Sequence, residues 1–227
     1  MFDQKVLKLL RSGMLFYEME VSEIGKALEE LEAKVVTVRK DEFVFYQEDE
    51  PRFILVLLDG QVVVGRDSPD GRRSVMAKFS DPGDMFGEVY SFLQHPYDCF
   101  SIAEKDSMIL EIPVGRFRTA PGDGYIGKVS FNLMRAFAAK AYYLNQRLQA
   151  VTGSTLRQKL AKTFLLPDFH DEDDLFKMKR EQLADFVNAA RPSVSREISA
   201  MQEDGLIEVV KGGIRIVDYD AMENLLP

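Results

Sequence analysis

KREQLADFVNAARPSVSREISAMQEDG, residues 179–205, is the stretch that decides the fold of this chain. Apolar residues recur at helical spacing before Asn188 and again after Pro192, whose fixed φ and missing N–H suit the first turn of a helix. Gly205 stands where helices commonly end, because glycine adopts a positive φ without strain. The pattern therefore predicts two short helices joined by a tight turn at residues 188–190.

The second predicted helix sorts its residues by face. At about 100° per residue, Val194, Ile198 and Met201 form an apolar stripe that should pack on the first helix. The remaining polar face consists of Arg191, Pro192, Ser193, Ser195, Arg196 and Ser199. Short side chains allow close approach to DNA, and a guanidinium can donate to both O6 and N7 of guanine, so this face fits a major groove. A plain helical hairpin with an ordinary polar surface is the alternative.

A β-hairpin is expected directly after these helices. β-rich runs on both sides of Gly212-Gly213 predict two strands joined by a tight turn. Such a hairpin beside a helix-turn-helix is a wing, and Lys211 at its tip could reach a DNA phosphate. Lys179, just before the first helix, belongs to the same cluster of basic residues. Together these elements predict a winged helix-turn-helix that binds DNA.

The segments ARPSVSREI at 190–198 and EDGLI at 203–207 resemble the winged helix-turn-helix of the CRP/FNR family of bacterial transcription regulators. The resemblance implies that Arg191, Ser193, Ser195 and Arg196 contact operator DNA. It covers nearly the whole chain and implies an α+β fold in three parts. These are an N-terminal antiparallel β-roll or jelly-roll sensor domain (residues 1–123), a long dimerisation helix (124–153) and a C-terminal winged helix-turn-helix (154–227).

The same resemblance implies the partners: double-stranded operator DNA, a second copy of the chain as homodimer, RNA polymerase and a small effector. Pro192 stands where many members have glutamate, so we expect an operator that differs from the best-known family sequence. A homodimer would read two half-sites about one helical turn (~34 Å) apart. The chain is thus expected to be a regulator with no catalytic residues.

Composition and charge fit this reading with one reservation. The chain of 227 residues has no apolar run that could span a bilayer and no signal peptide, and its lone cysteine suits the cytoplasm. The net charge of −8 argues against nonspecific grip on phosphates, although specific binding depends on the local surface. The acidic run Asp171–Asp174 is therefore expected to be a solvated loop turned away from DNA.

The first half of the chain changes period from helix to strand. In residues 1–33 we expect helices, with Leu7, Leu10 and Met14 on one face and Ser22 at a helix start. Short β-rich runs then occur at 35–38, 43–46, 53–58, 61–64 and 108–112. Turn signals separate them at Asp59-Gly60, Pro69–Gly71 and Asp81–Asp84. This pattern predicts an antiparallel sandwich or barrel that could enclose a small cavity.

PGDMFGEVY at 82–90 resembles the effector cassette of cyclic-nucleotide-binding members of the family. The resemblance implies that backbone N–H groups at Gly87 face a phosphate and that Glu88 faces the ribose. Those members supply an arginine further along, whereas this chain reads HPYDCFSIA at 95–103. A buried phosphate that faced Asp98 would lack a cationic partner, so cyclic AMP is not expected as effector. The candidate pocket for a different small molecule comprises Gly87, Glu88, Val89, Asp98 and Cys99.

Other functions of the β-domain were weighed on the same residues. Iron–sulfur sensing requires several cysteines, and Cys99 is alone, so we interpret it as a small core residue rather than a redox switch. Haem sensing through His95 and a cyclic-nucleotide receptor with an altered phosphate pocket stay as alternatives. A cupin-like metalloenzyme is the least favoured, because His95 and His170 fall in different domains and no metal site is expected.

A long proline-free stretch, residues 125–153, is expected to form the dimerisation helix. Its predicted seam alternates by three and four as in a coiled coil and consists of Phe131, Met134, Ala138, Ala141, Asn145 and Leu148. A second apolar stripe, which should cover the β-domain, consists of Leu133, Phe137, Leu144 and Val151. The alternative is a single buried helix inside a monomer.

Overall fold

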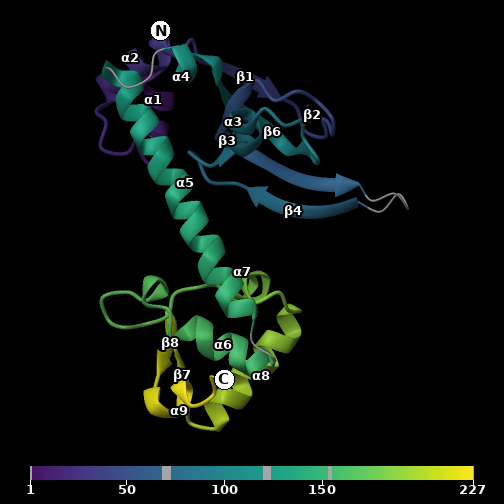
Figure 1. The fold of residues 1–227 in the computed structure, drawn as a ribbon, viewed down its shortest axis with the longest axis vertical. Coiled ribbons are helices and arrows are strands. Elements are labelled where there is room, and N and C mark those ends of the chain that lie inside the picture. Colours follow the sequence, from purple (N-terminus) through teal and green to yellow (C-terminus); the bar gives the residue numbers. More distant parts are fainter. Residues whose placement is uncertain (1, 68–72, 120–123, 153–154, 227) are drawn as a thin grey trace. The chain divides into compact units, whose positions relative to one another are not determined.

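The computed structural model describes residues 2–67, 73–119, 124–152 and 155–226 (Figure 1). The chain divides into two compact units, residues 1–137 and 138–227, and the division falls inside helix α5 (Gly124–Val151). Each unit has its own hydrophobic core. The predicted boundaries near residues 123 and 153 fall on or next to residues outside the described ranges, so the three-part division stays a prediction.

Short helices begin the first unit: α1 (Gln4–Leu10), the 3-10 helix η1 (Met14–Phe16) and α2 (Val21–Glu30). The predicted stripe is wrong at Met14, because the chain turns after α1 and leaves Met14 50% exposed while Leu15 and Phe16 are buried. Ser22 does not start a helix either. Glu20 caps α2 through a reciprocal capping box with Glu23, which satisfies two backbone N–H groups.

An antiparallel sheet follows, built from β1 (Lys34–Val38), β2 (Phe43–Phe45), β3 (Phe53–Asp67), β4 (Arg73–Phe79), β5 (Met85–Phe86) and β6 (Phe100–Pro113). Strand β6 pairs with β1, β2 and β3, and β3 also pairs with β4 and β5. The predicted antiparallel β-roll is confirmed. Two short helices, α3 (Glu88–Leu93) and α4 (Gly115–Thr119), flank β6 in the sequence.

The turn expected at Asp59-Gly60 is wrong. Strand β3 continues through both residues, and its pairing with β6 shifts register there. Gly60 has φ +100°, and a Cβ at this position would lie 2.5 Å from the backbone oxygen of Asp106, so glycine permits a bulge instead of a turn. Strands β4 and β5 were not expected. The turn signal Pro69–Gly71 lies outside the described residues.

The two faces of β3 pack into different clusters, as the alternation of side chains along a strand requires. Ile54, Val56 and Leu58 join the core formed with α1, α2 and the first half of α5. Leu55 and Leu57 face an aromatic-rich cluster inside the roll, together with Phe45, Phe86, Tyr97, Cys99 and Ile109. The side chains in this interior cluster therefore determine what the roll can bind.

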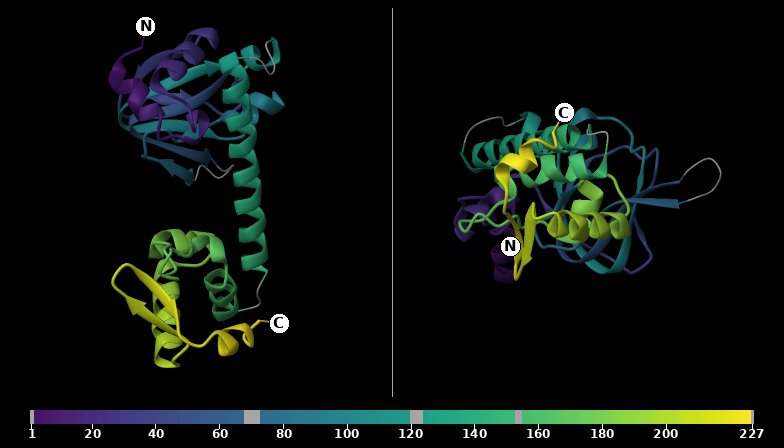
Figure 2. Two further views of the ribbon diagram at one scale, coloured as in Figure 1. Left: turned by 90° about the vertical axis from the view of Figure 1, so that its left-hand side faces the viewer. Right: turned by 90° about the horizontal axis from the view of Figure 1, so that it is seen from below.

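The second unit holds α6 (Leu156–Phe164), η2 (Pro167–Phe169), α7 (Arg180–Phe186), α8 (Arg191–Glu203), β7 (Ile207–Val210), β8 (Gly213–Ile216) and α9 (Tyr219–Glu223). Helices α7 and α8 form the predicted helix-turn-helix, and the β7–β8 hairpin lies beside α8 (Figure 2). Gly205 follows α8 with φ +76°. The winged helix-turn-helix is thus confirmed. No helix among the described residues is long and apolar enough to cross a membrane.

Candidate nucleic-acid interface and effector site

Helix α8 is fixed to its unit along one side. Val194, Ile198 and Met201 are 0%, 2% and 0% exposed and pack into the core with Leu183 and Val187 of the preceding segment. The helix begins at Arg191, one residue earlier than expected, so Pro192 occupies its second position, where the missing N–H costs no hydrogen bond. The apolar stripe predicted from the sequence therefore holds α8 in place.

A charged contact fixes α8 from α6 as well. The guanidinium of Arg157 donates from Nε to the carboxylate of Glu197 at 2.6 Å and from Nη1 to that of Asp204 at 2.6 Å. These two acids raise the pKa of Arg157 above its usual value. Arg157 joins the middle of α8 to its C-terminal end, which restrains the helix against rotation about its own axis. Sequence reasoning did not identify this residue.

The polar face of α8 is left open to solvent. Arg191, Pro192, Ser195, Arg196 and Ser199 are exposed, and Ser193 is half-buried. The contact from Arg196 Nη2 to Ser193 Oγ is long, at 3.4 Å, so the guanidinium can reorient toward a ligand. Within the described part of the chain, neither Arg191 nor Arg196 forms an ion pair.

Basic residues from other elements accompany this face. Lys211 is exposed between β7 and β8, and Lys179 is exposed at the start of α7. Lys177 lies in the same stretch, but its Nζ is 2.8 Å from the carboxylate of Asp171. Lys179 and Lys211 are therefore the lysines available to phosphates, and their DNA contacts, like those of α8, stay a prediction.

The acidic run is more than a solvated loop. Asp171 accepts hydrogen bonds from the backbone of Asp173 and Leu175, and its other oxygen pairs with Lys177. Asp174 accepts from His170 at 2.8 Å and from Tyr219 at 2.7 Å. These contacts lower the pKa of both carboxyl groups, for Asp171 chiefly through Lys177 and for Asp174 chiefly through Tyr219. The run thus anchors the segment before α7. Residues 172–174 are exposed to solvent in a turn, as expected, and their orientation away from DNA stays a prediction.

In the β-roll, Tyr97 lies against Gly87, where the resemblance implies a phosphate-binding turn. Gly87 has φ +71° and precedes α3, and Glu88 is buried. A Cβ at Gly87 would lie 3.1 Å from the hydroxyl oxygen of Tyr97. Tyr97 is 4% exposed and stacks on Phe45 with ring centroids 3.7 Å apart, and burial raises its pKa to about 12. The space in front of Gly87 is therefore filled by an aromatic side chain.

Asp98 has a cationic partner that sequence reasoning missed. Arg66 donates from Nε to the backbone carbonyl oxygen of Asp98 at 3.1 Å and from Nη2 to the carboxylate of Asp98. The same carboxylate also accepts a hydrogen bond from the hydroxyl of Tyr90. The segment 95–103 contains no arginine, but Arg66 of β3 supplies one to Asp98 in space. The pairing of Gly65 with Phe100 between β3 and β6 brings Arg66 close. Predicting this contact would have required the register between β3 and β6, which the sequence alone does not give.

The other candidate effector residues are dispersed. Cys99 is 2% exposed in the aromatic cluster, and burial raises the pKa of its thiol, which disfavours the reactive thiolate. Val89 is 45% exposed on α3, and His95 is exposed after that helix. No group of three or more His, Cys, Asp or Glu in the described ranges is placed to hold a metal ion.

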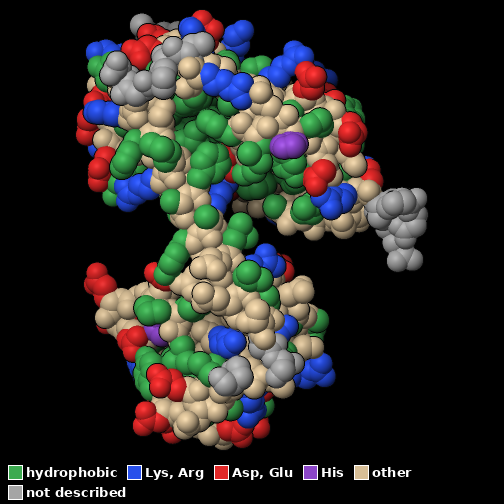
Figure 3. All heavy atoms as spheres, viewed as in Figure 1, with side chains coloured by type: hydrophobic (Ala, Val, Ile, Leu, Met, Phe, Trp, Pro, Cys, Tyr) green, Lys and Arg blue, Asp and Glu red, His purple; other side chains and the backbone are tan. Residues whose placement is uncertain are grey.

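Helix α5 carries an exposed apolar stripe. Phe131, Met134 and Leu148 are 63%, 61% and 60% exposed, and the other three residues of the predicted seam are exposed too. Figure 3 shows hydrophobic side chains uncovered along this helix. The second stripe is partly wrong: Leu133 is buried, but Leu144 is 58% exposed because it lies beyond the first unit. The alternative of a single buried helix is therefore wrong.

The C-terminal half of α5 belongs to the second unit. Arg147 donates to the backbone oxygens of Asp185 at 2.7 Å and Phe186 at 3.3 Å, which caps the end of α7. Gln146 donates to the carboxylate of Asp168 at 3.0 Å, and Tyr142 does so at 2.9 Å. A rotation of this part of α5 would therefore carry α7 with it.

Two family models match the chain: the cyclic nucleotide-binding domain over residues 35–120 and the Crp-like helix-turn-helix domain over residues 158–225. A cyclic AMP receptor protein of Thermus thermophilus is 21% identical over 95% of this chain and 98% of its own length. A CRP-like cAMP-activated global transcriptional regulator of Mycobacterium tuberculosis is 22% identical over 94% of this chain and 96% of its own length.

Solved structures share the fold. The crystal structure of the Thermus thermophilus catabolite activator protein superposes with a TM-score of 0.52 at 21% identity, and covers 94% of this chain and 98% of its own. That of DNR from Pseudomonas aeruginosa gives a TM-score of 0.50 at 18% identity, and covers 99% of each chain. At these identities the likeness concerns the arrangement of elements, and the site chemistry rests on the residues described above.

Proposed function

The chain belongs to the CRP/FNR family of DNA-binding transcription regulators, and on that premise we propose that it reads its operator as a homodimer through the polar face of α8. The observation that carries the proposal is the contrast between the two sides of this helix. One side is buried and tied to α6, while the other exposes short hydroxyls and two arginines that form no ion pair within the described residues. Matched relatives are regulators, and the chain is not an enzyme.

Dimerisation is supported by the exposed seam on α5. Three large apolar side chains, each about three-fifths exposed, lie on one helix face, and burying them would contribute about 1.5–3 kcal/mol each. Asn145 within the seam would select a two-stranded pairing in one register, as polar seam residues do. The dimer would place two copies of α8 on two half-sites.

The effector proposed for the roll is a small molecule other than a cyclic nucleotide. Tyr97 covers Gly87, and the Arg66 guanidinium is already paired with Asp98, so neither group is open to a phosphate in this arrangement. The hydroxyl of Ser101 is buried and has no hydrogen-bond partner among the described residues, which a polar ligand in the roll would relieve. Gly87, Glu88, Asp98 and Cys99 remain candidate residues elsewhere in the roll, and Val89, which is 45% exposed, is the weakest.

We propose one further partner and a cellular location on the basis of the family. A regulator that binds operator DNA acts where RNA polymerase acts, so we place the chain in the cytoplasm with the polymerase as partner. The lone cysteine, Cys99, is compatible with that reducing compartment.

Selection of bound DNA from a random pool tests the DNA-reading proposal. We expect an enriched inverted repeat with half-sites about one helical turn (~34 Å) apart. Enrichment of no sequence, or of a single asymmetric site, would contradict it. Calorimetric titration with cyclic AMP and cyclic GMP tests the effector separately, and saturable heat from either would overturn the exclusion of cyclic nucleotides without touching the DNA-binding proposal.

A further inference from the structure

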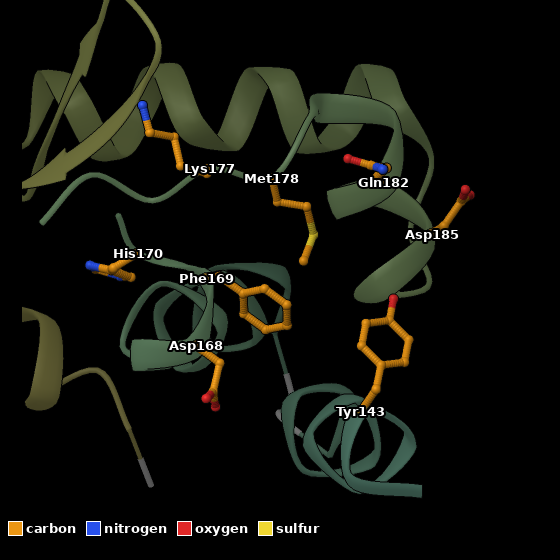
Figure 4. A pocket seen from close by; sticks show the side chains of 8 residues that line it. All are labelled: Tyr143, Asp168, Phe169, His170, Lys177, Met178, Gln182 and Asp185. Carbon is orange, nitrogen blue, oxygen red and sulfur yellow. The ribbon is translucent and has the colours of Figure 1, made fainter. Parts of the chain in front are cut away.

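A cavity of about 430 Å³ lies in the second unit (Figure 4), and none of its lining residues belongs to α8. Its walls come from three places: the C-terminal half of α5, the η2 segment, and the residues that lead into and form α7. The volume falls within the range of small-molecule sites, which is about 300–1,000 Å³. Nothing in the DNA-reading mechanism uses this cavity.

The centre of the cavity is apolar. The ring of Phe169 lies in the middle, the thioether of Met178 points toward it, and the Tyr143 hydroxyl points from α5 toward α7 (Figure 4). The rings of Tyr143 and Phe169 are edge-on, with centroids 6.4 Å apart. Aromatic rings and a polarisable sulfur favour a flat, unsaturated ligand over a branched aliphatic one.

The charge of the lining is negative once internal pairs are removed. Lys177 is paired with Asp171 at 2.8 Å, and His170 contacts Asp174 at 2.8 Å. Asp168 accepts hydrogen bonds, but from the uncharged Tyr142 and Gln146. Asp185 at the rim forms no ion pair with any described residue, although the Arg147 guanidinium donates to its backbone oxygen at 2.7 Å. Burial raises the pKa of Tyr143, the positive charge of Arg147 lowers it, and the negative charge of Asp185 raises it by less. The carboxylates of Asp168 and Asp185 are thus the acidic groups of the lining that form no ion pair among the described residues.

The cavity stays open when the chain pairs. At about 100° per residue, Tyr143 points roughly opposite to the predicted seam of α5, so a second copy docked on that seam would not cover it. The polar face of α8 lies on another element, and DNA bound there leaves the walls of the cavity in place. A ligand could therefore bind the dimer both with and without DNA.

We propose that this cavity binds a small planar aromatic cation, with its ring against Phe169, Met178 and Tyr143 and its positive group at the Asp185 carboxylate. Such a ligand would contact both α5 and α7. These helices are already linked by the hydrogen bond from Arg147 to the Asp185 backbone, and α5 is also linked to η2 by the hydrogen bond from Gln146 to Asp168. If the helix-turn-helix can adopt two orientations relative to α5, the ligand would shift the equilibrium between them. The size of that shift would equal the difference in the ligand's binding free energy for the two orientations. Only this consequence rests on the proposed function; the binding does not.

Tryptamine is the probe, because it joins an indole ring to an ammonium and the chain contains no tryptophan. Fluorescence anisotropy of tryptamine, excited where tyrosine does not absorb, reports binding to the full chain without DNA. Indole-3-acetate carries the same ring with a negative charge, and ethylamine carries the ammonium without a ring. We expect saturable binding of tryptamine, no binding of indole-3-acetate and no displacement by ethylamine at equal concentration.

Asp185→Asn removes the negative charge of a side chain that lines the cavity and keeps its size and shape. Asp173→Asn is the matched control, because it removes a negative charge from a residue that does not line the cavity. We expect Asp185→Asn to weaken tryptamine binding roughly tenfold, in line with loss of a charged hydrogen bond, and Asp173→Asn to leave it unchanged. Absence of saturation, equal binding of indole-3-acetate, or unchanged affinity in Asp185→Asn would each overturn the proposal. Because no DNA is present, failure here says nothing against operator reading.

Discussion

Arg196 carries the most specific chemistry on the exposed side of α8. Its guanidinium is held by a single long contact to Ser193 at 3.4 Å, so little is lost when it turns to a base. The side chains of Ser195 and Ser199 beside it are short. The Ser199 hydroxyl donates a hydrogen bond to the Ser195 carbonyl oxygen within the same helix. Under the proposed function, these short neighbours would let the helix backbone approach the major groove closely enough for Arg196 to reach a guanine edge.

Arg196→Ala should weaken binding to the selected operator by about 1–3 kcal/mol, because a bidentate contact to guanine is lost. Gel-shift titration measures this loss. Arg52→Ala is the matched control, since it removes the same side chain from an exposed pair in the first unit and should leave the affinity unchanged. Equal affinities of the wild type and Arg196→Ala would remove Arg196 from the reading surface.

Arg157 is a second single residue whose substitution is informative, because it stabilises the position of α8 and is not expected to contact DNA. Arg157→Ala leaves Glu197 and Asp204 without their guanidinium partner, so opening of α8 should become easier by about 1–3 kcal/mol. Hydrogen exchange of the α8 amides, followed by mass spectrometry, reports this local free energy. Arg11→Ala breaks a comparable pair with Glu20 in the other unit and should not alter exchange in α8. Unchanged exchange in Arg157→Ala would show that burial alone holds the helix.

Residues within one element were predictable, and contacts between distant segments were not. Helical periodicity placed Val194, Ile198 and Met201 in the core, because only neighbouring turns of one helix are involved. Arg66 escaped, because its contact with Asp98 depends on the register of β3 against β6. The role of Arg157 likewise depends on how α6 packs on α8.

Among the elements, α5 has the clearest unsatisfied surface. Its seam is exposed in the single chain, although large apolar side chains gain by leaving water. Ala138 and Ala139 are adjacent and both exposed, but at about 100° per residue Ala138 lies in the seam and Ala139 well outside it. They form a matched pair for testing which face of the helix dimerises.

Ala138→Glu should shift the chain toward monomer, because pairing would bring two carboxylates together in an apolar seam at a cost of several kcal/mol. Ala139→Glu carries the same change in charge and helix propensity and should stay dimeric. Sedimentation equilibrium distinguishes the two outcomes. Dimers of equal strength in both variants would place the interface elsewhere.

The type of an element was more predictable than its length. Two β-rich runs around Asp59-Gly60 proved to be one strand, since Gly60 with its positive φ takes up a register shift without reversing the chain. Met14 was misplaced because Gly13 begins a 3-10 turn after α1. Of these two glycines, Gly60 alone has a positive φ, whereas Gly13 is in an ordinary extended conformation and nothing in the composition marks the turn after it.

For the whole molecule, what matters is that two units share one helix. Residues 124–137 of α5 pack in the core of the first unit, and residues 138–151 contact α7 and η2 in the second. Helix α5 therefore contributes side chains to the packing of both units. The order of elements and the fold class were predictable along the chain, whereas the chemistry inside the roll required the structure.

The net charge of the whole chain affects how the protein can bind DNA. With a net charge of −8, the protein gains little from general attraction to phosphates, so under the proposed function its affinity would come from local contacts on α8 and the wing. We therefore expect base contacts to weigh heavily in its binding.

Methylation interference at guanine N7 on the selected operator tests the central claim most directly, because N7 lies in the major groove that α8 is proposed to read. The account predicts two symmetric clusters of interfering guanines, about one helical turn (~34 Å) apart, with the signal at one guanine of each cluster lost in Arg196→Ala. Binding that tolerates methylation at every guanine of the operator, or interference confined to one side, would contradict it.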